Sequence, residues 1–434
     1  MNMAETLNLE CLCSTLQPEL LRAELDAHPG LRGMAQKLAI DQPHLFSNSP
    51  VFISAGDFEI LARSVSVLHR TGDLPAYQAC ALQRSAPIAS MRWGPQGVFM
   101  GYDFHMGADG PRLIEINTNA GGAFLHAAAA RAHRSCCEAM HRMFHAPAAL
   151  DRLDEVFLSM FRAEWLAQRG DAPLRTIAIV DDEPANQYLA PEFELARALF
   201  AGHGIAAVIA DPRELEWRSG ALWHPLLPEG LPVDLIYNRL TDFDLSLPAH
   251  AALRSAYDSG AAVVTPDPRA HALHADKRNL VALSDDALLA SWGVAGQDRA
   301  LLRTVVPRTQ LVTADNAEAL WAQRRRLFFK PAAGYGSKGA YRGDKLTRRV
   351  WTQIVAGNFI AQDFVAPSER LVNIGGLPTR LKLDVRAYAY AGQIQLLAAR
   401  TYAGQTTNFR TAGGGFSPVV IIPDTPSAAV VSQP

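Results

Sequence analysis

Hydrophobic residues recur along the chain with two different spacings, and the change between them divides it into regions. Over residues 1–95 the apolar positions recur at three and four, as in PELLRAELDAHPGLRGMAQKL, which predicts a mainly helical region. From residue 175 short apolar runs alternate with amphipathic stretches closed by glycine, the pattern of β–α–β units. We therefore expect a helical start and, over 175–268, a small open parallel sheet covered by helices.

Two further regions and a tail complete the expected order. Residues 96–174 contain two short strands, VFMGYDFHM and LIEIN, followed by an alanine-rich helix over Gly122–His145. Residues 269–422 begin with a helix around KRNLVALSDDALLASWG and continue as an antiparallel-rich sheet. The small, polar and proline-containing segment 423–434 is expected to be disordered. The expected fold class is mixed α/β (α+β), built from several units.

Composition narrows the class of protein without naming a ligand. The 434 residues are 49% hydrophobic, and 41 Lys and Arg balance 43 Asp and Glu, for a net charge of −2. This balance gives no electrostatic footprint for nucleic acid or an anionic membrane, and no apolar run is long enough to span a bilayer. The five cysteines are scattered and no secretion signal is visible, so we expect a cytoplasmic protein with reduced thiols.

The strands LIEIN and LKLDVR carry the sharpest candidate for metal chemistry. Residues two apart in a strand share a face, so Glu115 projects with Asn117 and Asp384 projects with Arg386. Carboxylate and amide oxygens are the ligands that Mg²⁺ accepts, together with water and phosphate oxygens. A polar, solvated sheet face would show the same alternation, and the pattern alone leaves both interpretations open.

A glycine-rich segment, FFKPAAGYGSKGAYRG, offers a phosphate-binding loop. Gly334, Gly336 and Gly339 follow a strand, with Lys330 at its end and Lys338 inside the loop. The spacing is a weak match to the dinucleotide fingerprint, because no apolar helix opens after the third glycine, and the Walker A pattern is absent. Backbone N–H groups could close over phosphates here, although a plain glycine hairpin remains the alternative.

Downstream residues suit a transferring phosphoryl group or a developing oxyanion. Arg400, Asn408 and Arg410 precede the run Gly413–Gly415, so cations, an amide and bare backbone come close together in the sequence. Arg239 ends a predicted parallel strand, where open α/β sheets bind ligands, and is a candidate for gripping a substrate carboxylate. A surface salt bridge is the competing interpretation of Arg239.

Six motifs in one order resemble the ATP-grasp enzymes: GYDF with LIEIN, HADKRNL, FFKP with its glycine loop, QDFV, LDVR, and NFR before GGG. The Glu-x-Asn strand comes first here, whereas it comes last in the common arrangement. The order therefore resembles circularly permuted ATP-grasp proteins such as eukaryotic-type glutathione synthetase. One position departs from that enzyme. Glutathione synthetase carries a metal-binding glutamate four residues after its loop lysine, whereas this chain has Gly334 at that position. The substrate therefore need not be a glutathione precursor.

The resemblance implies a role for each candidate residue. Those expected to bind ATP are Lys277, Lys330, Gly334, Gly336, Ser337, Lys338, Gly339 and the hinge Gln362, Asp363, Phe364 and Val365. Those expected to hold Mg²⁺ are Glu115, Asn117 and Asp384. Those expected to face phosphate or an acyl-phosphate are Arg386, Arg400, Asn408 and Arg410, and those expected to contact substrate are Arg239, Asn119, Gly414 and Gly415.

The activity implied is an ATP- and Mg²⁺-dependent carboxylate–amine ligase that forms an amide through an acyl-phosphate and releases ADP and phosphate. Its partners would be small molecules, an amino acid or small peptide among them, with a homo-oligomer left open. Two alternatives are a phosphotransferase without an amine acceptor and a nucleotide-binding module without catalysis. The implied units are 1–95, a permuted ATP-grasp segment at 96–174, a substrate-side α/β unit at 175–268 and the ATP-grasp core at 269–422.

Overall fold

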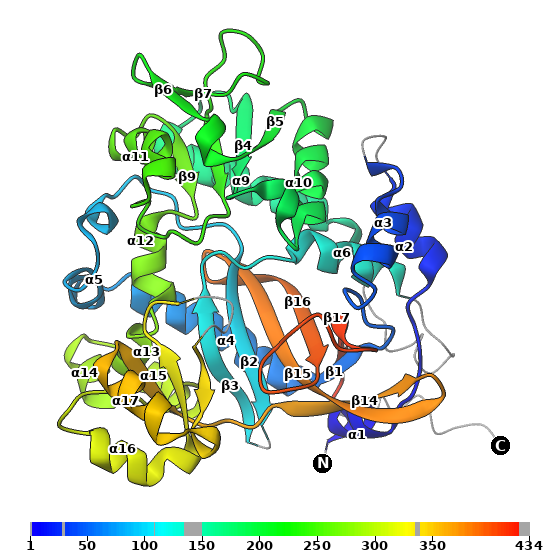
Figure 1. Ribbon diagram of the computed structural model, residues 1–434, viewed down its shortest axis with the longest axis vertical. Helices are drawn as coiled ribbons and strands as arrows, with labels where there is room; N and C mark the ends of the chain where they lie inside the picture. The colour runs from blue at the N-terminus through cyan, green and yellow to red at the C-terminus, as the bar shows by residue number, and fades with distance from the viewer. Residues whose placement is uncertain (1, 28–30, 108, 134–149, 335–338, 425–434) are drawn as a thin grey trace.

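The computed structural model describes residues 2–27, 31–107, 109–133, 150–334 and 339–424. Its largest sheet has seven strands in the order β1-β17-β16-β15-β2-β3, with β14 paired to β15 (Figure 1). All neighbours in it are antiparallel except β1 and β17. Its strands are β1 (Val51–Ser54), β2 (Met100–Gly107), β3 (Gly110–Asn117), β14 (Ser368–Ile374), β15 (Leu377–Tyr390), β16 (Gln393–Tyr402) and β17 (Gly415–Ile422).

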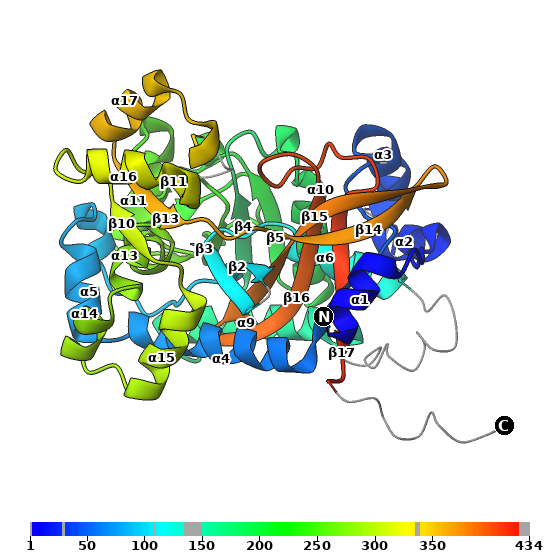
Figure 2. The ribbon, with the colours of Figure 1, turned by 90° about the horizontal axis from the view of Figure 1, so that it is seen from below.

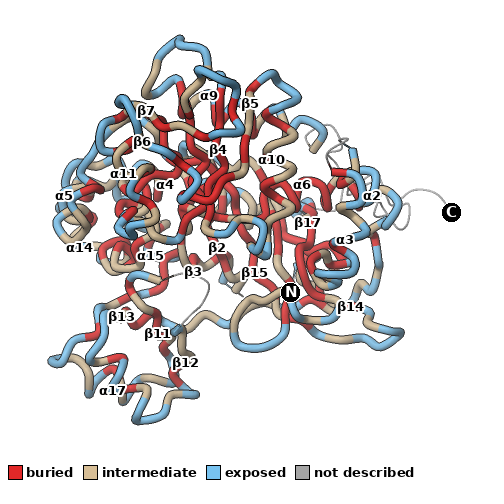
Figure 3. The backbone as a smooth tube through the Cα atoms, turned by 45° about the horizontal axis from the view of Figure 1, so that its top comes forward, coloured by how far each residue is buried: buried red, intermediate tan, exposed pale blue. Residues whose placement is uncertain are grey.

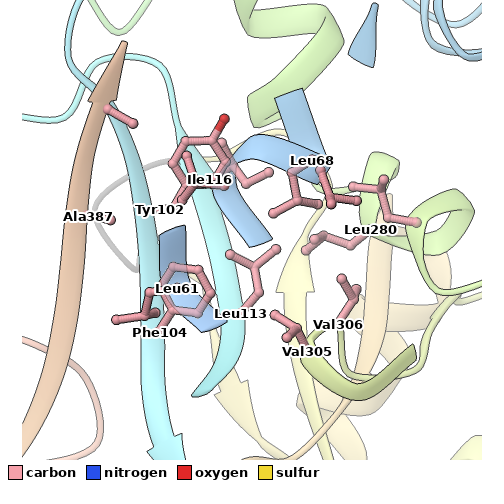
Figure 4. Packing of buried hydrophobic residues seen from close by; sticks show 14 of the residues in the cluster. Leu61, Leu68, Tyr102, Phe104, Leu113, Ile116, Leu280, Val305, Val306 and Ala387 are labelled. Atoms are coloured by element: carbon pink, nitrogen blue, oxygen red, sulfur yellow. The ribbon is translucent and has the colours of Figure 1, made fainter. Parts of the chain in front are cut away.

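Alternation along β15 separates an apolar face from a polar one. Val385 and Ala387 are buried in a core shared with helix α4 (Ala55–Gly72), which runs across that face of the sheet (Figure 2). Leu61 and Leu68 of α4 pack there against Tyr102, Phe104 and Leu113 of β2 and β3 (Figure 4). The opposite face is covered in part by α6 (Ala123–Ala132) and α9 (Leu153–Arg169), and it carries Asp384, Arg386 and Tyr388.

The four strands expected over 175–268 form and pair in parallel, in the order β5-β4-β8-β9. They are β4 (Thr176–Val180), β5 (Ala206–Ala210), β8 (Leu235–Asn238) and β9 (Val263–Thr265). Helices α10 (Ala190–Gly202), α11 (Ala251–Asp258) and α9 pack around this sheet (Figure 1). A two-stranded hairpin that the sequence pattern did not indicate, β6 (Glu216–Arg218) with β7 (Ala221–Trp223), projects beyond it.

The single antiparallel-rich sheet expected over 269–422 is wrong, because those strands divide between two sheets. A small four-stranded sheet has the order β10-β13-β11-β12. Its strands are β10 (Thr309–Leu311), β11 (Leu327–Pro331), β12 (Tyr341–Arg342) and β13 (Phe359–Asp363), and we call this sheet with helices α16 (Ala317–Gln323) and α17 (Arg348–Ala356) the small lobe. The expected helix before it is also broken, since Asp285 caps a new helix by accepting from Leu288 N. The pieces are α13 (Asn279–Leu283) and α14 (Asp286–Ser291), followed by α15 (Gly296–Val305).

The first 95 residues are mainly helical, with one strand that the pattern missed. β1 is fully buried and pairs with the last strand of the sheet, and its run of four apolar or small residues is too short to show a period. The helices are α1 (Met3–Glu10), α2 (Pro18–Leu25), α3 (Met34–Asp41), α4 and α5 (Pro75–Leu82). The expected alanine-rich helix ends at Ala132, earlier than predicted, because His133 is its extended C-cap and forms a β-bridge with Leu16. Residues 134–149 and the tail from 425 lie outside the described residues.

Short helical turns make up the remaining regular structure. They are η2 (Pro87–Ser90), η3 (Pro184–Asn186), η4 (Pro212–Glu214), η5 (Pro248–His250), α12 (Pro268–Ala270), η6 (His271–Ala275), η7 (Arg324–Arg326) and η8 (Gly343–Lys345). No helix in the described ranges combines the length and the apolar character that a membrane span requires.

Candidate functional site

A cavity of about 530 Å³ lies between the polar face of the large sheet and the small lobe. Its walls come from β2, β3, β15 and β16 on one side and from β11 and the end of β13 on the other. Many of the residues expected to bind ATP, metal or the transferring phosphate line it: Glu115, Asn117, Lys277, Lys330, Gly334, Gln362, Asp363, Phe364, Val365, Asp384 and Arg400. Regions far apart in the sequence therefore meet around one space.

Lys330 lies at the end of β11, buried in the cavity wall. Its Nζ donates to the Ile114 carbonyl at 2.7 Å and to Gln362 Oε1 at 3.0 Å, which links the small lobe to β3. Burial lowers the pKa of Lys330 to about 8, against the opposing effect of the Glu115 carboxylate. The side chain is thus a buried cation with two neutral partners, and an anion entering the cavity would be a stronger one.

Lys277 lies at the junction of the glycine loop and β3. Its Nζ donates to the Gly334 carbonyl at 2.8 Å and is 3.8 Å from Glu115 Oε2. Its backbone N–H also donates to the Ala332 carbonyl, so the residue is held at both ends. Gly336, Ser337 and Lys338 of the same loop lie outside the described residues.

The hinge segment Gln362–Val365 uses much of its backbone within the protein. The N–H groups of Asp363 and Phe364 donate to the carbonyls of Arg308 and Arg326. The Val365 carbonyl is 2.8 Å from His105 Nδ1, and because a carbonyl can only accept, that nitrogen carries the proton. Burial lowers the pKa of His105, so the neutral imidazole makes this bond at neutral pH.

Asp103 of β2 gathers the cations of the large sheet. Its carboxylate accepts from Arg386 Nε at 2.6 Å and Nη2 at 2.7 Å, and from Arg400 Nη2 at 2.9 Å. Arg400 Nε donates onward to Asp384 at 2.7 Å, and Thr407 donates to the other oxygen of Asp384 at 2.5 Å. Burial alone would raise the pKa of Asp103, but the two guanidinium groups hold it well below its usual value. We call these hydrogen-bonded side chains the arginine–aspartate network; its members are ionised and paired with one another.

Glu115 and Asn117 share the cavity-facing side of β3. The Asn117 amide donates to Asp103 at 3.2 Å and to Glu115 at 3.4 Å. Burial favours the neutral acid, yet Lys277 and Lys330 hold the pKa of Glu115 below its ordinary value, so the carboxylate is charged at neutral pH. A charged carboxylate beside an amide oxygen is a donor set that fits Mg²⁺.

The third expected metal ligand, Asp384, has both oxygens engaged by Arg400 and Thr407. Among the residues that the structure describes, no three His, Cys, Asp or Glu side chains are grouped as a preformed metal centre. The residues therefore fit a cation that arrives with phosphate oxygens as further ligands, rather than one caged by protein alone.

Several expected site residues do not line the cavity. Arg386 lies behind Asp103, Asn408 bonds the carbonyls of Ala403 and Thr406 within its own loop, and Arg410 is exposed. The remaining ones outside the cavity lining are Gly339, Gly414, Gly415, Asn119 and Arg239.

Three of these make structural contacts that the motifs could not show. Gly415 has φ of +115°, and a Cβ there would lie 2.5 Å from the His44 carbonyl oxygen, so the start of β17 requires glycine. Arg239 is buried rather than a surface residue: its Nη1 lies 3.4 Å from the Tyr237 hydroxyl, and a Cβ on Gly121 would lie 2.7 Å from its Nη2. Asn119 donates to the Leu240 carbonyl at 3.0 Å, beside Arg239 in the chain.

Sequence reasoning missed other residues that do line the cavity, notably Asp103, His105, Arg342, Lys345 and Thr407. The signal for the first two was present, since GYDFH alternates Tyr102 and Phe104 with Asp103 and His105. In the sequence, Arg342 and Lys345 are two ordinary cations that follow the glycine loop. Thr407 is an ordinary threonine in a different loop. No local pattern separates these three from surface residues.

Comparison with known proteins gives information on the fold of the chain. No family model matches the chain, and no curated protein matches it in sequence. Among solved structures, a glutathione synthetase-like effector from Globodera pallida in its apo form superposes with a TM-score of 0.55 at 12% identity, over 94% of this chain and 98% of that one. A putative gamma-glutamylcysteine synthetase from Methylobacillus flagellatus gives a TM-score of 0.46 at 12% identity, over 84% and 87%. The first of these two superpositions shows that the chain has the fold of a glutathione synthetase-like protein, in agreement with the resemblance of its motifs.

Proposed function

We propose that the protein is an ATP- and Mg²⁺-dependent ligase that joins a carboxylate to an amine. The observation that carries this proposal is the meeting of Lys277 and Lys330 with Glu115 and Asn117 in one cavity, between two sheets. Cations for phosphate oxygens and hard ligands for a metal are what phosphoryl transfer from ATP needs, because that chemistry depends on positioning and charge stabilisation.

The reaction would proceed in two steps. A substrate carboxylate oxygen attacks the γ-phosphorus and the bond to the β-phosphate oxygen breaks, which forms an acyl-phosphate and ADP. The amine nitrogen then attacks the acyl carbon, inorganic phosphate leaves with the C–O bonding electrons, and the nitrogen loses a proton. Phosphorylation is needed because a free carboxylate is a poor electrophile.

The chain's residues would divide this work. Lys277 and Lys330 would bind phosphate oxygens, and the hinge beside Phe364 would bind the adenine ring of ATP. Glu115 and Asn117, with Asp384 if Arg400 releases it, would hold Mg²⁺, which when bound screens the phosphate charge. Arg400 is the cation of the arginine–aspartate network that reaches the cavity, and it would orient the transferring group.

The regional organisation belongs to the same proposal. We assign residues 96–174 and 269–422 to a permuted ATP-grasp core and 175–268 to a substrate-side unit. The pairing of β2 with β15, which brings Asp103 opposite Arg386, supports this assignment. Arg239 and Asn119, near the end of the parallel sheet, would contact the carboxylate substrate there.

An ADP-release screen with Mg-ATP and a panel of amino acids and small peptides tests the proposal. ADP and free phosphate that appear only when an acid and an amine are both present would support the ligase. ADP without free phosphate would indicate a phosphotransferase instead. Absence of both nucleotide binding and ADP release across the panel would contradict a catalytic ATP site.

A further inference from the structure

The small lobe carries a cluster of cations on its outer surface. Arg325, Arg326, Arg348 and Arg349 are exposed, and with Arg324 and Lys345 they come from two short segments, 324–326 and 345–349. None of the six forms a salt bridge with a described residue, in a chain whose total charge is −2. We call these six residues the basic patch. Figure 2 shows α16 and α17, which flank it, together at one end of the molecule, and Figure 3 shows how much of that end is exposed.

The two segments are held together by close backbone packing. A Cβ on Gly343 would lie 1.8 Å from the Arg324 carbonyl oxygen, so only glycine lets the second segment approach the first. Two guanidinium groups then pack over the Trp321 ring, that of Arg324 at 4.0 Å and that of Arg348 at 4.2 Å from the ring centroid. Arg324 also donates to the Trp321 carbonyl at 2.9 Å. The patch is therefore an organised surface, with part of its side-chain entropy already lost before anything binds.

The patch continues into the cavity. Lys345 lines the cavity, as does Arg342, which lies 4.7 Å over the Phe364 ring and pairs with Asp344 at 3.0 Å. A ligand on the patch would thus end at the mouth of the candidate active site.

We propose that the basic patch binds an acidic polypeptide segment, one rich in Asp and Glu. Guanidinium groups that form no salt bridge with a described residue can match carboxylates in bidentate geometry, and two of them, Arg324 and Arg348, are already ordered against Trp321. Single-stranded nucleic acid, the other polyanion of this size, binds through aromatic side chains on which bases stack. No aromatic side chain in the described part of 309–363 is exposed, and Arg324, Arg348 and Trp351 all pack against the Trp321 ring. This inference does not depend on the proposed ligase activity, because it concerns binding alone.

Fluorescence anisotropy with the full chain tests the proposal, using a labelled peptide of alternating Glu and Ser. A peptide with Gln in place of Glu and a single-stranded oligonucleotide of equal charge serve as comparison probes. We expect the acidic peptide to bind most tightly, and its affinity to fall as salt rises from about 50 to 200 mM. The variant R325Q/R326Q/R348Q/R349Q should bind it at least about tenfold more weakly, because it loses four exposed cations that could pair with carboxylates.

A matched control removes the same charge elsewhere: R22Q/R32Q/R63Q/R162Q, four exposed arginines outside the small lobe. It should bind the acidic peptide as the unmodified chain does, and the thermal midpoints of both variants should show that they fold. Equal weakening in both variants would mean a general charge effect and would overturn the proposal. Tighter binding of the oligonucleotide, or of the Gln peptide, would overturn it as well.

Discussion

The two walls of the cavity satisfy their charges in opposite ways. On the large sheet, Asp103, Arg386, Arg400 and Asp384 pair with one another, so this wall is charged but internally balanced. On the small lobe, Lys330 has only neutral hydrogen-bond acceptors within bonding distance, and the outer arginines form no salt bridge with a described residue. The first wall is therefore preorganised by its own contacts, whereas the second reaches its best electrostatic state only when an anion binds.

The largest effect should come from breaking the balanced wall. Asp103→Asn keeps the shape of the side chain but leaves Arg386 and Arg400 without their shared anion inside the protein. We expect the free energy of unfolding to fall by about 3–5 kcal/mol, measured by urea denaturation. Asp315→Asn, at an exposed aspartate of the small lobe, should stay within about 0.5 kcal/mol. If the two variants unfold at the same urea concentration, the network does not stabilise this wall.

Removing the cation of the other wall should affect activity more than stability. Lys330→Met leaves a linear apolar side chain of similar length, and we expect Mg-dependent ADP formation to fall by about 10²–10³-fold through loss of one charge-stabilising group. Lys37→Met, at an exposed lysine of α3, is the control and should leave turnover unchanged. Near-normal turnover of Lys330→Met would remove this residue from the site.

The pH dependence of nucleotide binding should separate the two walls. Lys330 is charged below its pKa of about 8 and loses its charge as the pH rises through that value, so attraction for phosphate weakens in the alkaline direction. We expect ADP affinity, measured calorimetrically, to fall by about tenfold between pH 7 and 9. Lys330→Arg keeps its charge over that range and should flatten the profile. The same slope in both proteins would assign the titration to another group.

The smallest effect should come from the end of the balanced wall. Thr407→Val removes the hydroxyl that donates to Asp384, and we expect a loss of about 1 kcal/mol in unfolding free energy. Thr407→Ser retains a hydroxyl and should restore most of it. If Thr407→Val and Thr407→Ser have the same free energy of unfolding, the hydrogen bond makes no net contribution to stability.

The sequence was informative wherever local periodicity decides the structure. Alternation in LIEIN and LKLDVR placed Glu115 with Asn117 on one side of β3, and Asp384 with Arg386 on one face of β15, and the parallel strands near Arg239 were visible from their spacing with helices. It was uninformative where non-local pairing decides. Nothing near Val51 or Phe328 tells that one strand joins the large sheet and the other the small lobe.

The role of a candidate residue was hardest to predict where ligand binding and backbone structure both favour the same amino acid. Gly415 satisfies a positive φ beside the His44 carbonyl, and Asn408 bonds its own loop, so both have structural explanations independent of any ligand. Asp103 shows the reverse: its importance comes from Arg386 and Arg400, which are nearly 300 positions later in the sequence. Only the register of β2 on β15 reveals that relation.

That register also has a consequence for how the protein is made. During synthesis on the ribosome, the β2–β3 hairpin emerges long before β15, the strand that covers the free edge of β2. Until then the nascent chain has an exposed strand edge, and Asp103 lacks the arginines that neutralise it. In the same way, β1 has no partner strand until β17 has been synthesised. Such late closure is typical of folding intermediates that depend on chaperones. The candidate site thus becomes complete only after Arg400 and Thr407, which follow β15 in the sequence, have left the ribosome.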